Sequence, residues 1–149
     1  RRTDCLEEAE AACRRACELE PNRATAHVNH GVALRNLGRL KEAEAVYRRA
    51  IELEPDNVVG LSSLGVAVRK RGRPKEAEAL YRQAIDIDPE YLPAWLNLAI
   101  ALQSRGADEE AQKAYRRALE LELSKESPDE SLGIRMSCPE VDLPLEARM

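Results

Sequence analysis

Apolar residues along this chain recur with the spacing of amphipathic helices. Between residues 41 and 54 they share one helical face, at Ala43, Val46, Tyr47, Ala50 and Ile51. A second helix is predicted upstream, over about residues 24–37, from the spacing of Val28, Leu34 and Leu37. Gly38 and Pro55 follow the two segments, and both residue types are typical of helix ends. The pattern therefore predicts two short helices joined by a tight turn.

The same helical pair recurs along the chain at a step of 34 residues. Pro21, Pro55 and Pro89 keep this step. Other columns are Ala9, Ala43, Ala77 and Ala111; Ala16, Ala50, Ala84 and Ala118; Gly38, Gly72 and Gly106; and Tyr47, Tyr81 and Tyr115. The small residues let two helix backbones approach closely, because a bulky side chain would force the pair apart. A fixed period of this length predicts a stacked repeat protein.

These columns, together with Trp95 and Leu98, resemble the tetratricopeptide repeat (TPR) over about residues 4–123. The resemblance implies an all-α fold, a right-handed α-solenoid of about seven helices. Its units would be residues 4–23, the second helix of an incomplete repeat, and full repeats at 24–57, 58–91 and 92–125. Residues 126–149 hold three prolines and no helical periodicity, which predicts an extended or disordered tail.

Composition and charge narrow the classes of function. Aromatic residues make up 3% of the chain, with no Phe, which favours helices over sheets. The net charge of −4 argues against sequence-independent binding of nucleic acid, because such binding requires a basic excess. No apolar run approaches the roughly 20 residues that span a bilayer. We therefore expect neither nucleic acid nor membrane insertion, and we favour a cytoplasmic location.

In TPR proteins the first helix of each repeat, helix A, lines a concave groove that usually binds the ligand. By this resemblance the groove residues here are Val28, Asn29, Val32, Arg35, Asn36, Ser62, Ser63, Val66, Arg69, Lys70, Leu96, Asn97, Ile100 and Gln103. Asn29, Ser63 and Asn97 share one column, and a side-chain amide can bracket a peptide backbone because it both donates and accepts. Stacked asparagines resemble the ladder in the TPR region of O-GlcNAc transferase. Alternatively, asparagine is simply common in this column.

The cations of the carboxylate clamp found in chaperone-binding TPR domains are absent here. The matching positions hold Val28, Val32, Ser63, Pro93 and Asn97. Instead an apolar stripe is formed by Val28, Val32, Val66, Leu96 and Ile100. This stripe favours an apolar or amphipathic peptide over an acidic tail, although part of it is expected to pack between neighbouring helices.

Two further sets of residues have structural explanations. Cys13, Cys17, His27 and His30 have the residue types of a Cys2His2 metal site, but the two cysteines stand in columns that are otherwise core. Arg14, Arg48 and Arg82 recur on the second helices, each four residues after a Glu, as in helix-surface ion pairs. No nucleophile elbow or Gly-rich phosphate loop is present. We expect no metal, no cofactor and no enzymatic activity.

The function favoured by the sequence is protein–protein interaction, with a peptide or helix of a partner held in the concave groove. A second hypothesis is self-assembly into a homo-oligomer through uncapped ends or the tail. A third is that the chain is the substrate-recognition arm of a larger enzyme, such as a glycosyltransferase.

Overall fold

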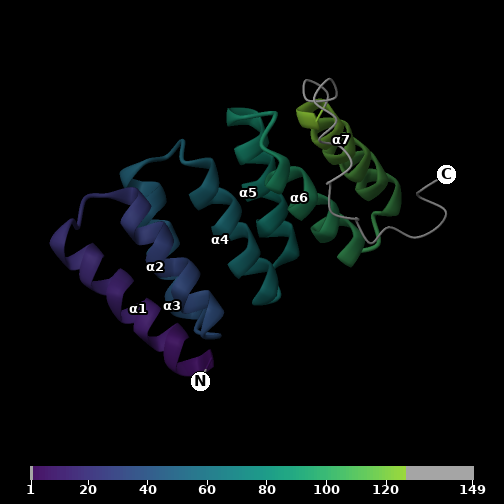
Figure 1. Cartoon of the computed structure of the whole chain (residues 1–149). Helices are drawn as coiled ribbons and strands as arrows, with labels where there is room; N and C mark the ends of the chain where they lie inside the picture. Colours follow the sequence, from purple (N-terminus) through teal and green to yellow (C-terminus); the bar gives the residue numbers. More distant parts are fainter. Residues whose placement is uncertain (1, 127–149) are drawn as a thin grey trace.

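A computed structural model describes residues 2–126, which form seven helices (Figure 1). They are α1 (Arg2–Leu19), α2 (Ala24–Asn36), α3 (Leu40–Leu53), α4 (Val58–Lys70), α5 (Pro74–Ile87), α6 (Leu92–Ser104) and α7 (Asp108–Glu126). No strand occurs within the described residues. The predicted tail lies outside them, apart from Glu126, which is the last residue of α7.

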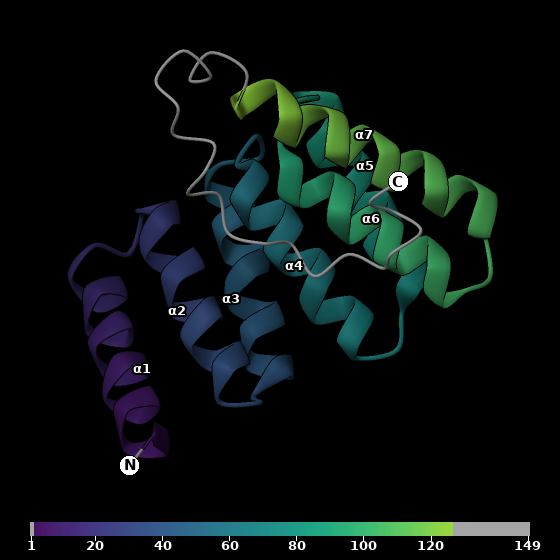
Figure 2. The same ribbon diagram turned by 45° about the vertical axis from the view of Figure 1, so that its right-hand side comes forward.

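The helices form a stack of hairpins in chain order, from α1 at one end to α7 at the other (Figures 1 and 2). Helices α2, α4 and α6 are the A helices, and α3, α5 and α7 are their B partners. Each helix packs on its neighbours in the chain, and α2 also packs on α4 and α4 on α6. Because the A helices touch one another, the stack curves toward them and they form its inner face. The prediction of an all-α solenoid is confirmed.

Glycine ends each A helix in the left-handed conformation that the sequence predicts. Gly38, Gly72 and Gly106 have φ angles of 82°, 89° and 83°. In the first turn the Arg39 amide donates to the Leu34 carbonyl at 2.9 Å, which is the outer bond of a Schellman motif. This conformation strains any residue with a side chain, so the glycine sets the angle at which each B helix returns along its A helix.

The two helices of each hairpin approach closely because glycine faces tyrosine. A Cβ atom added at Gly31 would lie 2.3 Å from the Tyr47 ring, and one added at Gly65 would lie 2.4 Å from the Tyr81 ring. Both tyrosines are completely buried. The ring therefore occupies the space that a side chain on helix A would need, which explains why Gly31 and Gly65 are separated by the same 34 residues as Tyr47 and Tyr81.

Helix α1 carries alanines in the same columns as the B helices, and no A helix precedes it within the described residues. Ala9 and Ala16 are exposed on it, whereas Ala43 and Ala50, in the same columns of the next repeat, are completely buried. The difference arises because no A helix within residues 2–126 covers this side of α1.

We predict that Gly31→Ala destabilises the chain by about 1–3 kcal/mol, because the added methyl group must displace the Tyr47 ring. Gly60→Ala is the matched control in α4, since its Cβ would meet ordinary contacts at 3.6 Å. This control should be neutral or slightly stabilising, because alanine favours helix more than glycine does. Urea unfolding measures both free energies, and equal stability of the two variants would contradict the packing described here.

Candidate functional site on the inner face

The inner face, formed by the A helices α2, α4 and α6, carries no acidic side chain. None of these three helices contains Asp or Glu, although the chain has 27 acidic residues. Three cations stand near their C-terminal ends: Arg35 on α2, and Arg69 and Lys70 on α4. Cations in the last turn also interact favourably with the helix dipole. The inner face is thus neutral to positive on a chain whose net charge is negative.

The acidic residues of the B helices bind arginines of the outer surface and of the turns. Glu44 is buried on α3 and accepts hydrogen bonds from Arg48 at 2.7 Å, from Arg71 at 2.5 Å and from Arg73. Arg71 and Arg73 belong to the turn of the next repeat. Glu44 therefore joins two repeats, a role that its spacing from Arg48 alone did not predict.

The next repeat uses the same device with a different arginine. Glu78, also buried, accepts from Nε of Arg105 at 2.5 Å and from its Nη2 at 3.2 Å. Arg82 does not form the predicted pair with Glu78 but binds Glu110 on α7 at 3.3 Å. On the outer surface, therefore, glutamates and arginines are paired with each other.

Glu44 keeps its charge in the folded state. Burial alone would raise the pKa of its carboxyl group, but the hydrogen bonds from Arg48 and Arg71 and the charge of Arg73 hold that pKa below its ordinary value. A buried carboxylate with these partners links adjacent repeats only while it is ionised.

The structure separates the groove residues predicted from the sequence into three groups. Five are exposed: Asn29, Asn36, Lys70, Leu96 and Gln103. Seven are partly exposed: Val32, Arg35, Ser63, Val66, Arg69, Asn97 and Ile100. Val28 and Ser62 are buried, with 5% and 4% of their surface exposed. The first two groups are the part of the predicted groove that a partner could reach.

Val28 and Ser62 instead take part in contacts between neighbouring A helices. A Cβ atom added at Gly60 on α4 would lie 3.6 Å from Val28 Cγ2, so the valine packs on the bare backbone there. Ser62 Oγ accepts a hydrogen bond from Asn97 Nδ2 at 3.2 Å. One amide of the predicted asparagine ladder is therefore already bound to α4, whereas Asn29 is exposed.

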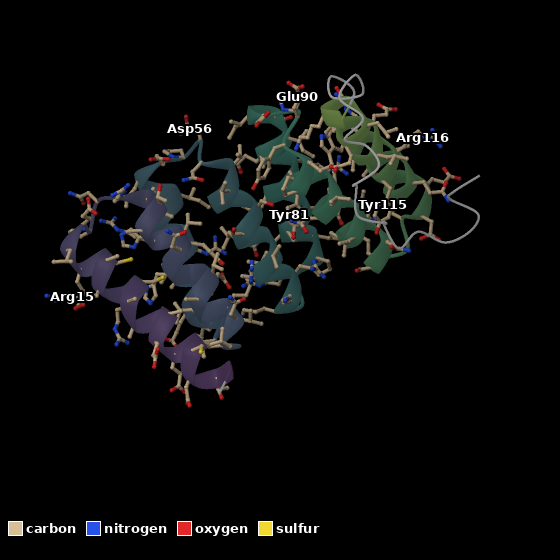
Figure 3. The ribbon with its side chains drawn as sticks, viewed as in Figure 1. Arg15, Asp56, Tyr81, Glu90, Tyr115 and Arg116 are labelled. Carbon is tan, nitrogen blue, oxygen red and sulfur yellow. The ribbon has the colours of Figure 1, made fainter. Side chains whose placement is uncertain are left out.

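The tyrosine side chains reach the inner face from the B helices. Tyr115 donates its hydroxyl hydrogen bond to Gln103 Oε1 at 3.1 Å, and Gln103 stands in the column of Arg35 and Arg69. Figure 3 shows Tyr81 in the interior of the stack. Each tyrosine hydroxyl is therefore placed beside the column that carries the two arginines.

The hydroxyls of Tyr47 and Tyr81 are buried, with Ser63 within hydrogen-bonding reach of the first and Arg69 of the second. The charge of Arg35 acts on both hydroxyls. Burial raises the pKa of both tyrosines, and the arginine charges offset part of this rise. Nε of Arg69 is likewise buried without a partner.

The two histidines act as structural hydrogen-bonding groups. His27 Nε2 lies 2.8 Å from the Pro21 carbonyl, and the Trp95 indole donates to the Pro89 carbonyl at the same distance. A carbonyl oxygen only accepts, so His27 must donate and thereby replaces the tryptophan of its column. His30 Nε2 lies 2.8 Å from Glu10 Oε2. Within residues 2–126 no three potential metal ligands come together.

The sequence reasoning missed a shallow pocket of about 550 Å³ on the outer side of α5, α6 and α7. Its lining is Arg82, Trp95, Leu98, Leu102, Glu110, Lys113, Ala114 and Arg117. Ala114 stands in the column of Val46 and Leu80, which pack against the core. The loss of side-chain volume in this column is the signal that could have revealed the pocket.

Comparisons with known proteins agree with this architecture. Family models of the tetratricopeptide repeat match residues 22–90 and 69–124. The crystal structure of MamA is similar with a TM-score of 0.74 and 24% identity, over 82% of this chain and 71% of that chain. The second TPR of Spaghetti (RPAP3), bound to the HSP90 peptide SRMEEVD, has a TM-score of 0.64 and 24% identity, over 76% and 98% of the two chains. A search of curated proteins gives no match.

None of the helices described here is long and apolar enough to cross a membrane.

We predict that Glu44→Gln lowers the free energy of unfolding at pH 7 by about 1–3 kcal/mol, because the arginines lose their buried counter-charge. The folded-state pKa of Glu44 is lowered, so the wild type loses this contribution as the pH falls through that pKa. The difference in the free energy of unfolding between wild type and Glu44→Gln should therefore shrink as the pH is lowered from 7 to 3.

Urea unfolding at a series of pH values measures this difference. Glu18→Gln, at an exposed position of α1, is the control and should follow the wild type throughout. A difference for Glu44→Gln that stays constant with pH would contradict the ionised role of Glu44.

Proposed function

The chain belongs to the tetratricopeptide repeat family, and we propose that it is a recognition module whose inner face binds a segment of a partner protein. The proposal concerns binding and assigns no catalytic step to this chain. Its main support is the chemistry of the inner face, where hydrogen-bonding side chains and cations are accessible and no carboxylate of the A helices competes for them.

The accessible residues suit an extended, amphipathic segment. The amides of Asn29 and Asn97 can bind peptide groups of the ligand backbone, although Asn97 must share its amide with Ser62. Val32, Val66 and Ile100 form a partly exposed apolar row across the three A helices. Such a row can bind apolar side chains of the ligand while the amides hold its backbone.

The structural neighbours support this use of the fold. The second TPR of Spaghetti (RPAP3) is bound to a peptide of HSP90. In the present chain the carboxylate-clamp positions hold Val28, Val32, Ser63, Pro93 and Asn97, so a different set of side chains must select the ligand.

A second candidate function is self-assembly through α1. Its exposed Ala9 and Ala16 lie on the side that an A helix covers in the other repeats. A second copy of the chain could supply that cover. If it does, light scattering will give a mass above one chain that falls on dilution, and Ala9→Glu will restore the single-chain mass. A single-chain mass of the wild type well above micromolar concentration would exclude this mode.

Selection from a random peptide library displayed on phage tests the inner-face proposal. We expect wild-type protein to enrich peptides whose affinity falls at least tenfold in the variant Asn29→Ala, Val66→Glu. A tenfold loss corresponds to about 1.4 kcal/mol of binding free energy.

The matched control is Ala45→Glu, Gln83→Ala, which makes the same kinds of change at exposed positions of α3 and α5. Circular dichroism verifies that both variants fold. Equal loss of affinity in the two variants, or loss in the control alone, would place the binding surface elsewhere.

A further inference from the structure

Two arginines from adjacent repeats occupy equivalent positions of the inner face, Arg35 on α2 and Arg69 on α4, and these two helices pack on each other. Arg69 lies within hydrogen-bonding reach of the Tyr81 hydroxyl, and the charge of Arg35 in the preceding repeat also works against the burial-induced rise in the pKa of that hydroxyl. Arg35 also acts on the hydroxyl of Tyr47. Figure 3 shows Tyr81 in the interior of the stack, whereas Arg15 and Arg116 project from opposite ends of it.

No carboxylate neutralises this pair within the described residues. The arginines of the outer surface and turns, such as Arg48, Arg71 and Arg105, each bind a glutamate. Arg35 and Arg69 form no ion pair with any residue between 2 and 126, and their helices contain no acid that could provide one. Like charges on neighbouring helices repel each other, and an anion bound between them relieves that repulsion.

Buried polar atoms lie directly behind the two arginines. The side chains of Tyr47 and Tyr81 are 0% exposed, with Ser63 within hydrogen-bonding reach of the first hydroxyl and Arg69 of the second. Nε of Arg69 is also buried without a partner. These atoms are closed off from solvent, so a ligand on the inner face reaches the arginines through their remaining guanidinium N–H groups and not through the hydroxyls.

From this arrangement we propose that Arg35 and Arg69 form a binding site for the carboxylate of an Asp or Glu in the partner segment. The guanidinium groups supply paired N–H donors, which match the two oxygens of a carboxylate. This site lies outside the clamp positions at Val28, Val32, Ser63, Pro93 and Asn97. It rests on the proposed function and specifies the ligand of that same face.

The site also predicts the sequence around the acidic residue. Val32 precedes Arg35 by three residues on α2, and Val66 precedes Arg69 by three on α4, so each valine lies about one helical turn from its arginine. A ligand that binds both rows must carry an apolar side chain within one or two residues of the carboxylate, because successive extended residues are only about 3.3 Å apart.

The test repeats the phage selection with wild type and with Arg35→Gln, Arg69→Gln. The matched control, Arg15→Gln, Arg116→Gln, removes the same charge from exposed positions of α1 and α7. We expect wild type and control to enrich peptides with an Asp or Glu at one fixed position beside an apolar residue. The inner-face variant should lose this acidic preference while still selecting apolar residues.

Affinity measurements on an enriched peptide then isolate the contact. Replacing its acidic residue by the corresponding amide should weaken binding to wild type at least tenfold and leave binding to Arg35→Gln, Arg69→Gln unchanged. Arg35→Lys, Arg69→Lys keeps the charge without the paired donors, so we expect intermediate affinity.

The outcomes separate the two proposals. Peptides enriched without a fixed acidic position would overturn the carboxylate site and leave inner-face recognition standing. An acidic preference that survives in Arg35→Gln, Arg69→Gln would place the carboxylate contact elsewhere. If wild type enriches no peptide, both proposals fail together.

Discussion

The contact between a glycine of helix A and a tyrosine of helix B is the constraint on which this architecture depends. Tyr47 and Tyr81 fill the space where a side chain on Gly31 or Gly65 would stand. This packing brings the two backbones close together and also directs each tyrosine through the hairpin, toward the face formed by the A helices. The residue that sets the helix spacing therefore also places a hydroxyl beside the arginine column of the inner face, as the Tyr115–Gln103 hydrogen bond shows.

Charge is distributed unevenly over this framework. The glutamates of the B helices bind arginines of the same helix and of the following turn, so most outer cations have partners. The A helices contain no Asp or Glu, so no carboxylate of these helices can pair with their cations. A chain with a net charge of −4 thus presents a neutral to positive inner face, which its total charge does not reveal. Total charge is a poor guide to partners when the two faces of a solenoid differ.

Much of the fold could be predicted from the sequence, because the 34-residue columns repeat the same steric solution. The left-handed glycines and the close glycine–tyrosine contacts follow directly from such columns. The accessible site was harder to predict. Val28 is buried because it packs on the backbone at Gly60 of the next repeat. Ser62 is buried at the contact where Asn97 of the next repeat donates a hydrogen bond to it. Likewise, Glu44 joins two repeats through Arg71 and Arg73, which lie 27 and 29 residues further along. Contacts between repeats depend on how the units stack, which spacing within one unit does not specify.

The inner face, with arginines that form no ion pair, is the surface proposed to recognise a partner. The most direct measurement is an NMR titration of the isotope-labelled chain with an acidic, amphipathic peptide, following the backbone amides and the arginine Nε–H signals. We expect saturable shifts confined to α2, α4 and α6, with the Nε–H signals of Arg35 and Arg69 among the largest. Shifts centred on α3, α5 and α7, with these two signals unmoved, would contradict the proposal.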